Sequence, residues 1–318
     1  MKSFLLLIIK RALLALALLS SVEFCAVRAD DGFYQKFGLD LDGAGRTHQW
    51  AIFAYGSGTS GSPFTAIDVS SPTAVSGFQV DGDIALAGVY SKLSVSGYGS
   101  VSGDRYDRTT STESRTGNGV IGGSRFSSSS LDSAAVNAIA ALKNVSNNAA
   151  ALTATSGSPA NITLDNSNKT FSNNGNPFNG KYVMKLGNFT LNNNATLTLN
   201  GAAGSAFVIN VSNNFSLNNG SKIVLSGGLT FSDVLFNIRG PSGTFSIGGG
   251  SLFNGTLLAY NSTSSTQRTL TISGANTLVN GQVIANKVVV SGGGKVKKPK
   301  KVSKDDDDDG HDHDDGHH

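Results

Sequence analysis

The densest set of side chains with metal-binding chemistry lies at the end of the chain. Four imidazoles, at His311, His313, His317 and His318, alternate with acidic residues after the run Asp305–Asp309. Imidazoles spaced this closely can chelate Zn²⁺, Ni²⁺ or Cu²⁺, and the carboxylates can attract Ca²⁺. The alternative is a structureless polar tail that keeps the protein soluble or touches charged polymers. We expect no cofactor in the folded domain and keep the four histidines as a candidate metal site.

Two Thr-x-Thr pairs could form a surface that orders water. Thr196 and Thr198 make one pair, and Thr269 and Thr271 make the other. Strand alternation places both hydroxyl groups of a pair on one face, as some ice-binding surfaces require. The alternative is that threonine is a good strand former whose hydroxyl group points outward. These four threonines are the candidate ligand face if the protein binds ice.

Side chains for acid–base catalysis are scarce. Within residues 30–294 the chain has one histidine, His48, and one glutamate, Glu113. Asp81 and Asp83 share one face of a strand and could serve glycoside hydrolysis or bind Ca²⁺. The Asp-Gly-Asp sequence is, however, typical of a solvated turn. We therefore expect no enzymatic activity, and rank a glycan-active enzyme on the same scaffold below the binding functions.

The first 29 residues have the features of a secretory signal peptide. Lys2, Lys10 and Arg11 precede a short apolar run, and small residues flank the expected cleavage point. Removing residues 1–29 takes away Cys25, the single cysteine, and reduces the formal charge from +3 to zero. The mature chain would then lack disulfides and the basic stripe that nucleic acid binding requires. We expect a secreted or cell-surface protein with no membrane span after cleavage.

The pattern of the body, residues 30–294, is that of many short strands. Short apolar runs separated by Gly, Asn and Ser pairs occupy residues 50–103 and 182–290. Residues 131–152 instead carry apolar side chains at helical spacing, and residues 104–130 show no period and are expected to form a surface loop. The prediction is a mainly β fold, an irregular β-solenoid with one flanking α-helix.

Residues 295–318 form a Lys/Asp/His-rich segment, predicted to be a disordered tail whose deletion leaves folding unchanged. The body is also rich in Asn-x-Ser/Thr sequons, which permit glycosylation in a suitable host. The sequons begin at Asn144, Asn161, Asn168, Asn188, Asn194, Asn210, Asn214, Asn219, Asn254 and Asn261.

Sequence blocks in the body resemble those of the choice-of-anchor A domain family. Phe78–Gly88 looks like its early Gly-rich block, and residues 134–156 resemble the helical insert that follows. The later strand blocks match in order at Phe207–Ser212, Val234–Ile238, Phe253–Ala259 and Asn280–Ala285. One departure is that Tyr260-Asn261-Ser262 stands where the family usually has Pro-Asn-Ala.

Much of the same region is also similar to the ice-binding β-solenoid family, through Ala195–Asn200, Ala206–Asn210 and Phe253–Ala259. Choice-of-anchor A domains are secreted or surface-displayed and are regarded as adhesive. The resemblance implies a non-enzymatic protein whose rows of Ser, Thr and Asn contact an extracellular polymer, a glycan or a cell surface. Ice binding is the alternative, because the same scaffold and hydroxyl-rich faces would serve it.

Overall fold

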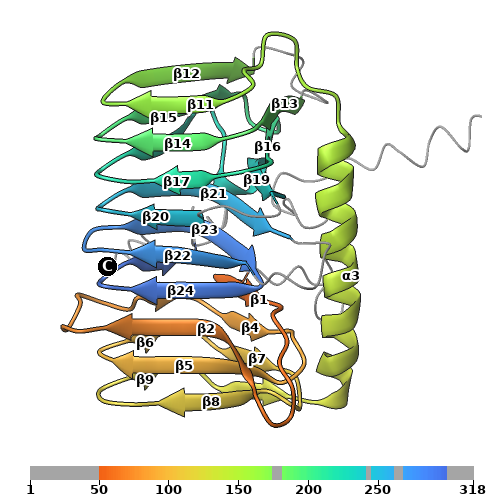
Figure 1. Ribbon diagram of the computed structural model, residues 1–318, viewed down its shortest axis with the longest axis vertical. Helices are drawn as coiled ribbons and strands as arrows, with labels where there is room; N and C mark the ends of the chain where they lie inside the picture. The colour runs from red at the N-terminus through yellow and green to blue at the C-terminus, as the bar shows by residue number, and fades with distance from the viewer. Residues whose placement is uncertain (1–49, 174–180, 241–244, 261–267, 299–318) are drawn as a thin grey trace, which may run out of the picture.

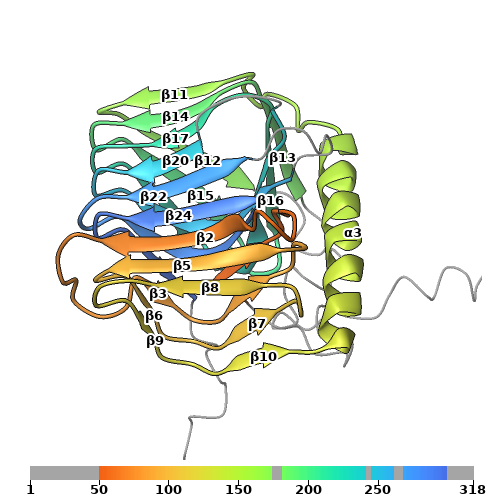
Figure 2. The same cartoon turned by 60° about the horizontal axis from the view of Figure 1, so that its bottom comes forward.

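The protein folds as a parallel β-solenoid with one helix along its side (Figures 1 and 2). The computed structural model describes residues 50–173, 181–240, 245–260 and 268–298. The coils have three faces, which we call a, b and c. Strands of faces a and c belong to a 16-stranded sheet, and those of face b form a separate 9-stranded sheet. The predicted mainly β fold with one flanking helix is confirmed.

Face b is the most regular of the three faces, with one strand from each of nine coils. In stacking order its strands are β11 (Ile162–Asp165), β14 (Phe189–Asn192), β17 (Phe215–Leu217), β20 (Phe245–Gly248), β22 (Thr269–Ser273), β24 (Lys287–Ser291), β2 (Phe64–Ser71), β5 (Ser91–Gly97) and β8 (Thr112–Arg115).

Face a lies under the helix, and face c is the third side. Face a contains β13 (Lys181–Leu186), β16 (Ala206–Val211), β19 (Val234–Ile238), β1 (Ile52–Ala54), β4 (Ile84–Leu86), β7 (Arg105–Asp107) and β10 (Arg125–Ser127). Face c contains β12 (Asn168–Asn173), β15 (Thr196–Gly201), β18 (Lys222–Ser226), β25 (Lys295–Lys297), β3 (Val80–Asp81), β6 (Ser100–Val101) and β9 (Val120–Ile121). A short 3₁₀ helix, η1 (Phe231–Asp233), precedes β19.

Two long strands, β21 (Leu252–Ala259) and β23 (Leu278–Ala285), bend from face c onto face a. Both bend at a glycine with positive φ, Gly255 at 142° and Gly281 at 141°. A Cβ at Gly281 would lie 1.9 Å from the carbonyl oxygen of Gly255. Only glycine permits both this backbone conformation and this close approach of the two coils.

The first described strand, β1, lies in the middle of the stack rather than at an end. From β1 it winds to β10, and α3 (Ser129–Ala151) then returns along face a to the opposite end, where β11 begins (Figure 1). The chain winds back until its last coil stacks on its first, pairing Val283 with Ile52, Val288 with Ile67 and Val296 with Val80. Contacts between the first and last described coils therefore hold the centre of the solenoid together.

Inward side chains stack into continuous apolar ladders. On face b the alternation buries one side chain in two, and Phe189, Phe215 and Phe245 lie in register. The rings of Phe189 and Phe215 stack with centroids 5.3 Å apart. Repeated burial of aromatic and branched side chains provides the main stabilisation of such a stack.

Helix α3 packs an apolar stripe on face a. Ser128 caps its N-terminus by accepting a hydrogen bond from the Leu131 amide at 3.3 Å. Ala138, Leu142, Val145 and Ala149 are buried in a cluster with side chains of face a. Asn144, Asn147 and Asn148 do not interrupt the helix. Within the described residues no helix is long and apolar enough to cross a membrane.

Two boundaries predicted from the sequence are wrong. Residues 104–130, expected to form a surface loop, contain β7, β8, β9 and β10 of the end coils. Inward positions of this end coil are charged: Arg105 and Asp107 are buried and pair with each other, and Glu113 pairs with Arg105, so the apolar period is missing. The other error is the start of the tail at residue 295, because Val296 is fully buried and β25 pairs with both β23 and β3. Residues 299–318 lie outside the described part of the chain.

Candidate functional site: the outer surface of face b

Face b carries a row of outward side chains that passes through all nine of its strands. Each member is paired in register with the next, and all but two carry a hydroxyl group, so we call the set the hydroxyl row. In stacking order the row is Thr163, Thr190, Ser216, Ser246, Thr271, Val289, Asp68, Ser94 and Ser114.

The geometry of the row follows from strand alternation and coil stacking. Neighbouring strands lie about 4.8 Å apart, so the hydroxyl groups repeat at about that distance along the solenoid. The Ser216 hydroxyl donates to the Thr190 hydroxyl at 3.5 Å, and both side chains are half-buried. Their remaining hydrogen-bonding capacity is directed outward. The row is thus a linear array of donors and acceptors on a rigid sheet.

A second polar row follows beside the first. Asn218 donates through its amide to the Asn192 side chain at 3.3 Å, and Ser273 pairs in register with Gly248 and Ser291. Face b is therefore polar and nearly flat across two side-chain rows. Charge is uneven along it: strands β14 to β22 carry no charged side chain, whereas Lys287, Asp68 and Lys92 follow on β24, β2 and β5.

The structure separates the four threonines predicted as one ligand face. Thr269 and Thr271 are on β22 of face b, whereas Thr196 and Thr198 are on β15 of face c. Their neighbours in register on β18 are Lys222 and Val224, so face c does not continue a hydroxyl row there. Of the four, only Thr271 belongs to the hydroxyl row.

Three of the sequons mark the position of this row in the sequence. Asn161, Asn188 and Asn214 stack at the corner between faces a and b, one per coil. The Oδ1 atom of Asn161 accepts from the Asn188 amide at 2.8 Å, and that of Asn188 accepts from the Asn214 amide at 3.4 Å. The residue after each asparagine points inward, and the next is a hydroxyl-row member. In these three coils the Asn-x-Ser/Thr pattern follows a repeated arrangement. The asparagine lies at the corner, the next residue lies in the core, and the serine or threonine lies on the outer face.

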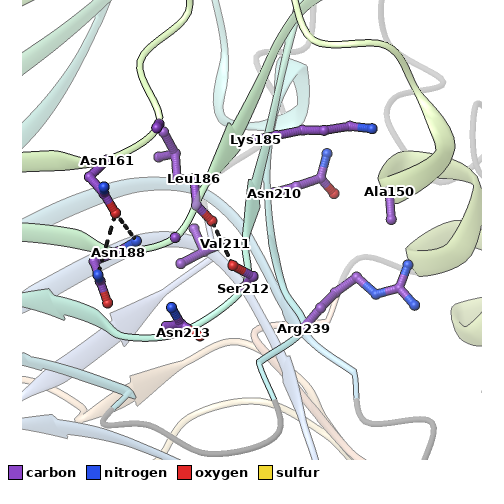
Figure 3. A pocket seen from close by; sticks show the side chains of 12 residues that line it. Ala150, Asn161, Lys185, Leu186, Asn188, Asn210, Val211, Ser212, Asn213 and Arg239 are labelled. Carbon is purple, nitrogen blue, oxygen red and sulfur yellow. Dashed lines mark hydrogen bonds between the residues drawn. The ribbon is translucent and has the colours of Figure 1, made fainter.

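A cleft of about 700 Å³ opens beside this corner, where the end of α3 meets the coils of β13, β16 and β19 (Figure 3). Lys185 and Arg239 extend toward the helix end from two coils that are separated by the coil of Asn210 (Figure 3). Asn161 and Asn213 line the other side. No acidic residue lines the cleft among the residues that the structure describes.

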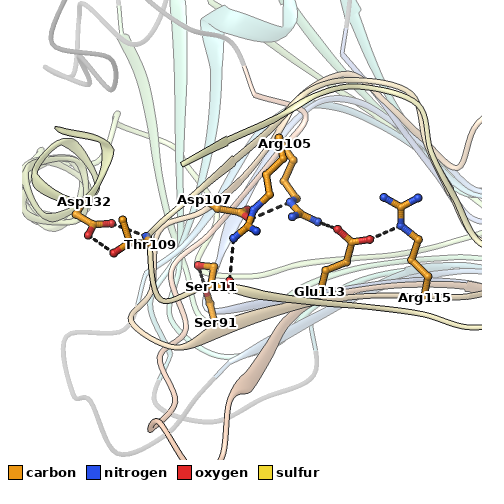
Figure 4. Close-up of polar contacts among 9 residues, drawn as sticks. Ser91, Arg105, Asp107, Thr109, Ser111, Glu113, Arg115 and Asp132 are labelled. Atoms are coloured by element: carbon orange, nitrogen blue, oxygen red, sulfur yellow. Dashed lines mark hydrogen bonds and ion pairs between the residues drawn. The ribbon is translucent and has the colours of Figure 1, made fainter. Parts of the chain in front are cut away.

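The acidic residues considered for catalysis have structural partners instead. Asp81 accepts from the Ser102 hydroxyl at 2.9 Å, and Asp83 accepts from the Asp104 amide at 2.9 Å. Glu113 is bonded by Arg105 and Arg115 in the end coil, and Asp107 pairs with Arg105 and Arg125 (Figure 4). These charged side chains cover the open end of the apolar core.

Within the described residues no group of three His, Cys, Asp or Glu could hold a metal ion. His48 and the candidate metal residues His311, His313, His317 and His318 lie outside that part of the chain. The metal site at these tail histidines therefore stays a prediction.

Glu113→Gln should destabilise the protein in a pH-dependent way. Burial opposes ionisation of Glu113, but hydrogen bonds from Arg115 and Arg105 outweigh it and lower the pKa of Glu113 below its usual 4.5. A lowered carboxyl pKa stabilises the folded state above pH 4.5, and this contribution is lost as the pH falls through the folded-state pKa. At pH 7 we expect a melting temperature about 2–4 °C below wild type, equivalent to about 1 kcal/mol.

The measurement is thermal unfolding of both proteins between pH 3 and pH 8. The difference between them should shrink toward zero at pH 3. Asp68→Asn, on the half-exposed outer surface of face b, is the control and should follow wild type throughout. A difference for Glu113→Gln that is constant with pH would show that its ion pairs contribute nothing to stability.

The sequence matches a family described as “Putative Ice-binding-like adhesive domain” over residues 44–297, which includes all three faces and the helix. The chain belongs to this ice-binding-like adhesive family. Its resemblance to the ice-binding β-solenoids is thereby confirmed, while the narrower assignment to the choice-of-anchor A domains stays a prediction. Among curated proteins the sequence has no match.

Three solved structures of ice-binding proteins are similar to this member of the family at low identity. The glycosylated protein LeIBP from an Arctic yeast is 17% identical with a TM-score of 0.48, and the match covers 82% of this chain and 94% of that one. The protein from the Antarctic ascomycete Antarctomyces psychrotrophicus is 17% identical with a TM-score of 0.45, covering 82% and 98%. A domain of ice-binding protein 1 from Shewanella frigidimarina is 16% identical with a TM-score of 0.47, covering 82% and 97%.

Proposed function

We propose that this ice-binding-like adhesive domain acts outside the cell as a non-enzymatic attachment protein, and that face b is its binding surface. The observation that supports the proposal is the hydroxyl row, which presents Ser and Thr side chains from nearly every coil on one rigid plane. The ligand would be an extended extracellular polymer or glycan surface with regularly repeated hydroxyl groups.

Many weak contacts make such a surface effective. One neutral hydrogen bond exchanged with water contributes only about 0.5–1.5 kcal/mol. A polymer held along several coils makes these contacts simultaneously, so that each further contact is effectively intramolecular. The rigid sheet costs no ordering of the protein on binding, which favours an extended ligand over a small one.

The charges on face b favour a hydrated polymer as the ligand. Asp68 lies within the hydroxyl row, and Lys92 and Lys287 stand on neighbouring strands. Charged groups keep their own hydration shells because their desolvation is costly, so they disturb an ordered water layer. A polymer with hydroxyl groups can instead accept and donate hydrogen bonds beside these charges.

Ice binding is the second candidate, supported by the charge-free half of the same face. Thr190, Ser216, Ser246 and Thr271 follow one another in register on β14, β17, β20 and β22, where no charged side chain occurs. That segment offers hydroxyl groups at about 4.8 Å spacing with no ionic group on its own four strands.

Placing two lysines in the hydroxyl row should abolish attachment. Ser216→Lys with Ser246→Lys covers the middle of face b with long charged side chains, while both positions remain at the surface. We expect retention on insoluble polysaccharides such as cellulose, chitin and β-glucan to fall at least about tenfold, equivalent to about 1.4 kcal/mol.

Thr196→Lys with Thr198→Lys is the matched control, because both threonines are half-buried outward positions on β15 of face c. The control should bind like wild type. Equal retention of both double variants would contradict the assignment to face b. Thermal hysteresis with faceted ice crystals, lost in the Ser216/Ser246 variant alone, would keep face b as the surface but make ice its ligand.

A further inference from the structure

The cleft at the end of α3 has the lining of a separate ligand site. Its volume of about 700 Å³ lies within the range of about 300–1,000 Å³ typical of small-molecule pockets. It is lined by the end of the helix, by the coils of β13, β16 and β19 on face a and by the corner that leads to face b. The hydroxyl row lies beyond that corner, so the cleft is not part of the proposed attachment surface.

The charge of the cleft is positive. Lys185 projects outward from β13, is exposed, and has no hydrogen-bond or ionic partner within the described residues. Arg239 donates to the Ser146 carbonyl oxygen at 3.3 Å and to the Asn147 side chain at 3.1 Å, on the helix above. The end of a helix carries only a partial negative charge. Arg239 suffices to balance it, which leaves the charge of Lys185 available to a ligand.

Neutral donors and small apolar groups line the rest of the cleft. The Asn213 side chain has no hydrogen-bond partner among the described residues and faces the cleft (Figure 3). Asn161 uses its Oδ1 atom to accept from Asn188, which leaves its amide hydrogens free for another acceptor. Ala150 and Ala160 add methyl groups to the wall.

The backbone amides of the corner are already occupied. Gly187 donates to the Ala160 carbonyl oxygen at 2.8 Å, and Asn213 donates to that of Gly187 at 2.8 Å. A ligand therefore has to be recognised by side chains. A single small anion would leave most of the cleft unfilled, whereas a sugar ring can place hydroxyl groups on the asparagines and C–H groups on the alanines.

We propose that this cleft binds an acidic sugar, with the carboxylate or sulfate group on Lys185 and the ring hydroxyl groups on Asn161 and Asn213. The ionic contact is exposed to solvent, so binding should be weak and should decrease with added salt. The site is independent of the hydroxyl row and holds one sugar unit.

The test is a ligand-observed NMR titration of the full chain with four probes. Galacturonate and galactose 6-sulfate carry the two acidic groups, galactose is the neutral match, and inorganic sulfate is the free anion. We expect both acidic sugars to bind at least about fivefold more tightly than galactose or sulfate, because each gains an ionic contact without losing the ring contacts.

Lys185→Met removes the charge and keeps most of the side-chain length. It should weaken galacturonate binding at least about fivefold. Lys222→Met, at an exposed position on β18 of face c, is the matched control and should bind like wild type. Both variants leave the core untouched, and their thermal unfolding should match that of wild type.

Three results would overturn the proposal: equal affinity for galactose, equal affinity for inorganic sulfate, or unchanged binding in Lys185→Met. The Ser216/Ser246 double lysine variant should still bind galacturonate, because a monosaccharide does not reach across face b. A failure of the cleft to bind acidic sugars would therefore be distinguished from a failure of face b to bind polysaccharides.

Discussion

Deleting residues 295–318 will lower the melting temperature by about 6–12 °C, whereas deleting residues 299–318 will leave it unchanged. The difference comes from β25, which lies between β23 and β3 and pairs with both at the junction of the last and first described coils. Val296 is fully buried between Val279 and Val80. Without it, this inward ladder loses a central member and the coils on either side lose contact.

The size of the expected decrease in melting temperature follows from the core position of Val296 and from the backbone hydrogen bonds of residues 296–298. Emptying one aliphatic position in a packed core costs on the order of 3 kcal/mol. The Val296 amide donates to the Gln79 carbonyl oxygen at 2.7 Å, and the Lys298 amide donates to that of Asp81 at 2.9 Å. In a domain of this size, 1 kcal/mol corresponds to about 2–4 °C in melting temperature.

Calorimetry or circular dichroism melts of the two truncated proteins beside the full chain measure this effect. The shorter deletion is the control, since it leaves β25 in place and removes only residues 299–318, whose composition predicts no buried apolar surface. Coincident melting curves for both deletions would mean that β25 does not join the two halves of the solenoid.

Asn237→Ala will lower the melting temperature by about 6–12 °C and make helix α3 sensitive to proteolysis. Asn237 is fully buried under the helix and satisfies groups on two elements. Its amide donates to the Ser146 carbonyl oxygen at 2.9 Å and to the Asn210 side chain at 2.7 Å, and its Oδ1 atom accepts from the Ser146 hydroxyl at 2.8 Å.

Alanine would leave the partners of Asn237 buried without hydrogen bonds. An unsatisfied buried group costs about 1–3 kcal/mol, and the space vacated by the amide adds to this. The effect is concentrated at the C-terminal half of α3, where Asn210 also binds the Ala149 carbonyl oxygen at 2.9 Å. A total of about 3 kcal/mol accounts for the expected shift.

Asn280→Ala is the matched control. Asn280 is half-buried on face c and donates to the Asn254 side chain at 3.1 Å, so water can replace its bond. We expect a shift below about 3 °C. The readouts are thermal unfolding and the rate of limited proteolysis within residues 129–151. Equal shifts for the two variants would show that apolar contacts alone dock the helix.

The sequence alone determines the local elements, because alternation and helical spacing are properties of neighbouring residues. The apolar stripe of residues 131–152 predicts α3, and the short runs after residue 182 predict strands that occur at those places. The same logic fails for residues 104–130, where Arg105, Asp107 and Glu113 take inward positions at the uncovered end of the stack. Alternation of apolar and polar residues cannot identify a strand whose inward side chains are charged and paired with one another.

Only the tertiary structure decides which side chains share a surface. Alternation shows that Thr198 and Thr271 both point outward, but not that they stand on different faces, since this depends on where each coil turns. The hydroxyl row also crosses the junction where Val289 lies beside Asp68, residues far apart in the chain. The two-residue alternation of a strand assigns a residue to the inside or the outside of a coil. The choice among the three faces, and the order of the coils, comes from the parallel strand pairing that forms the solenoid.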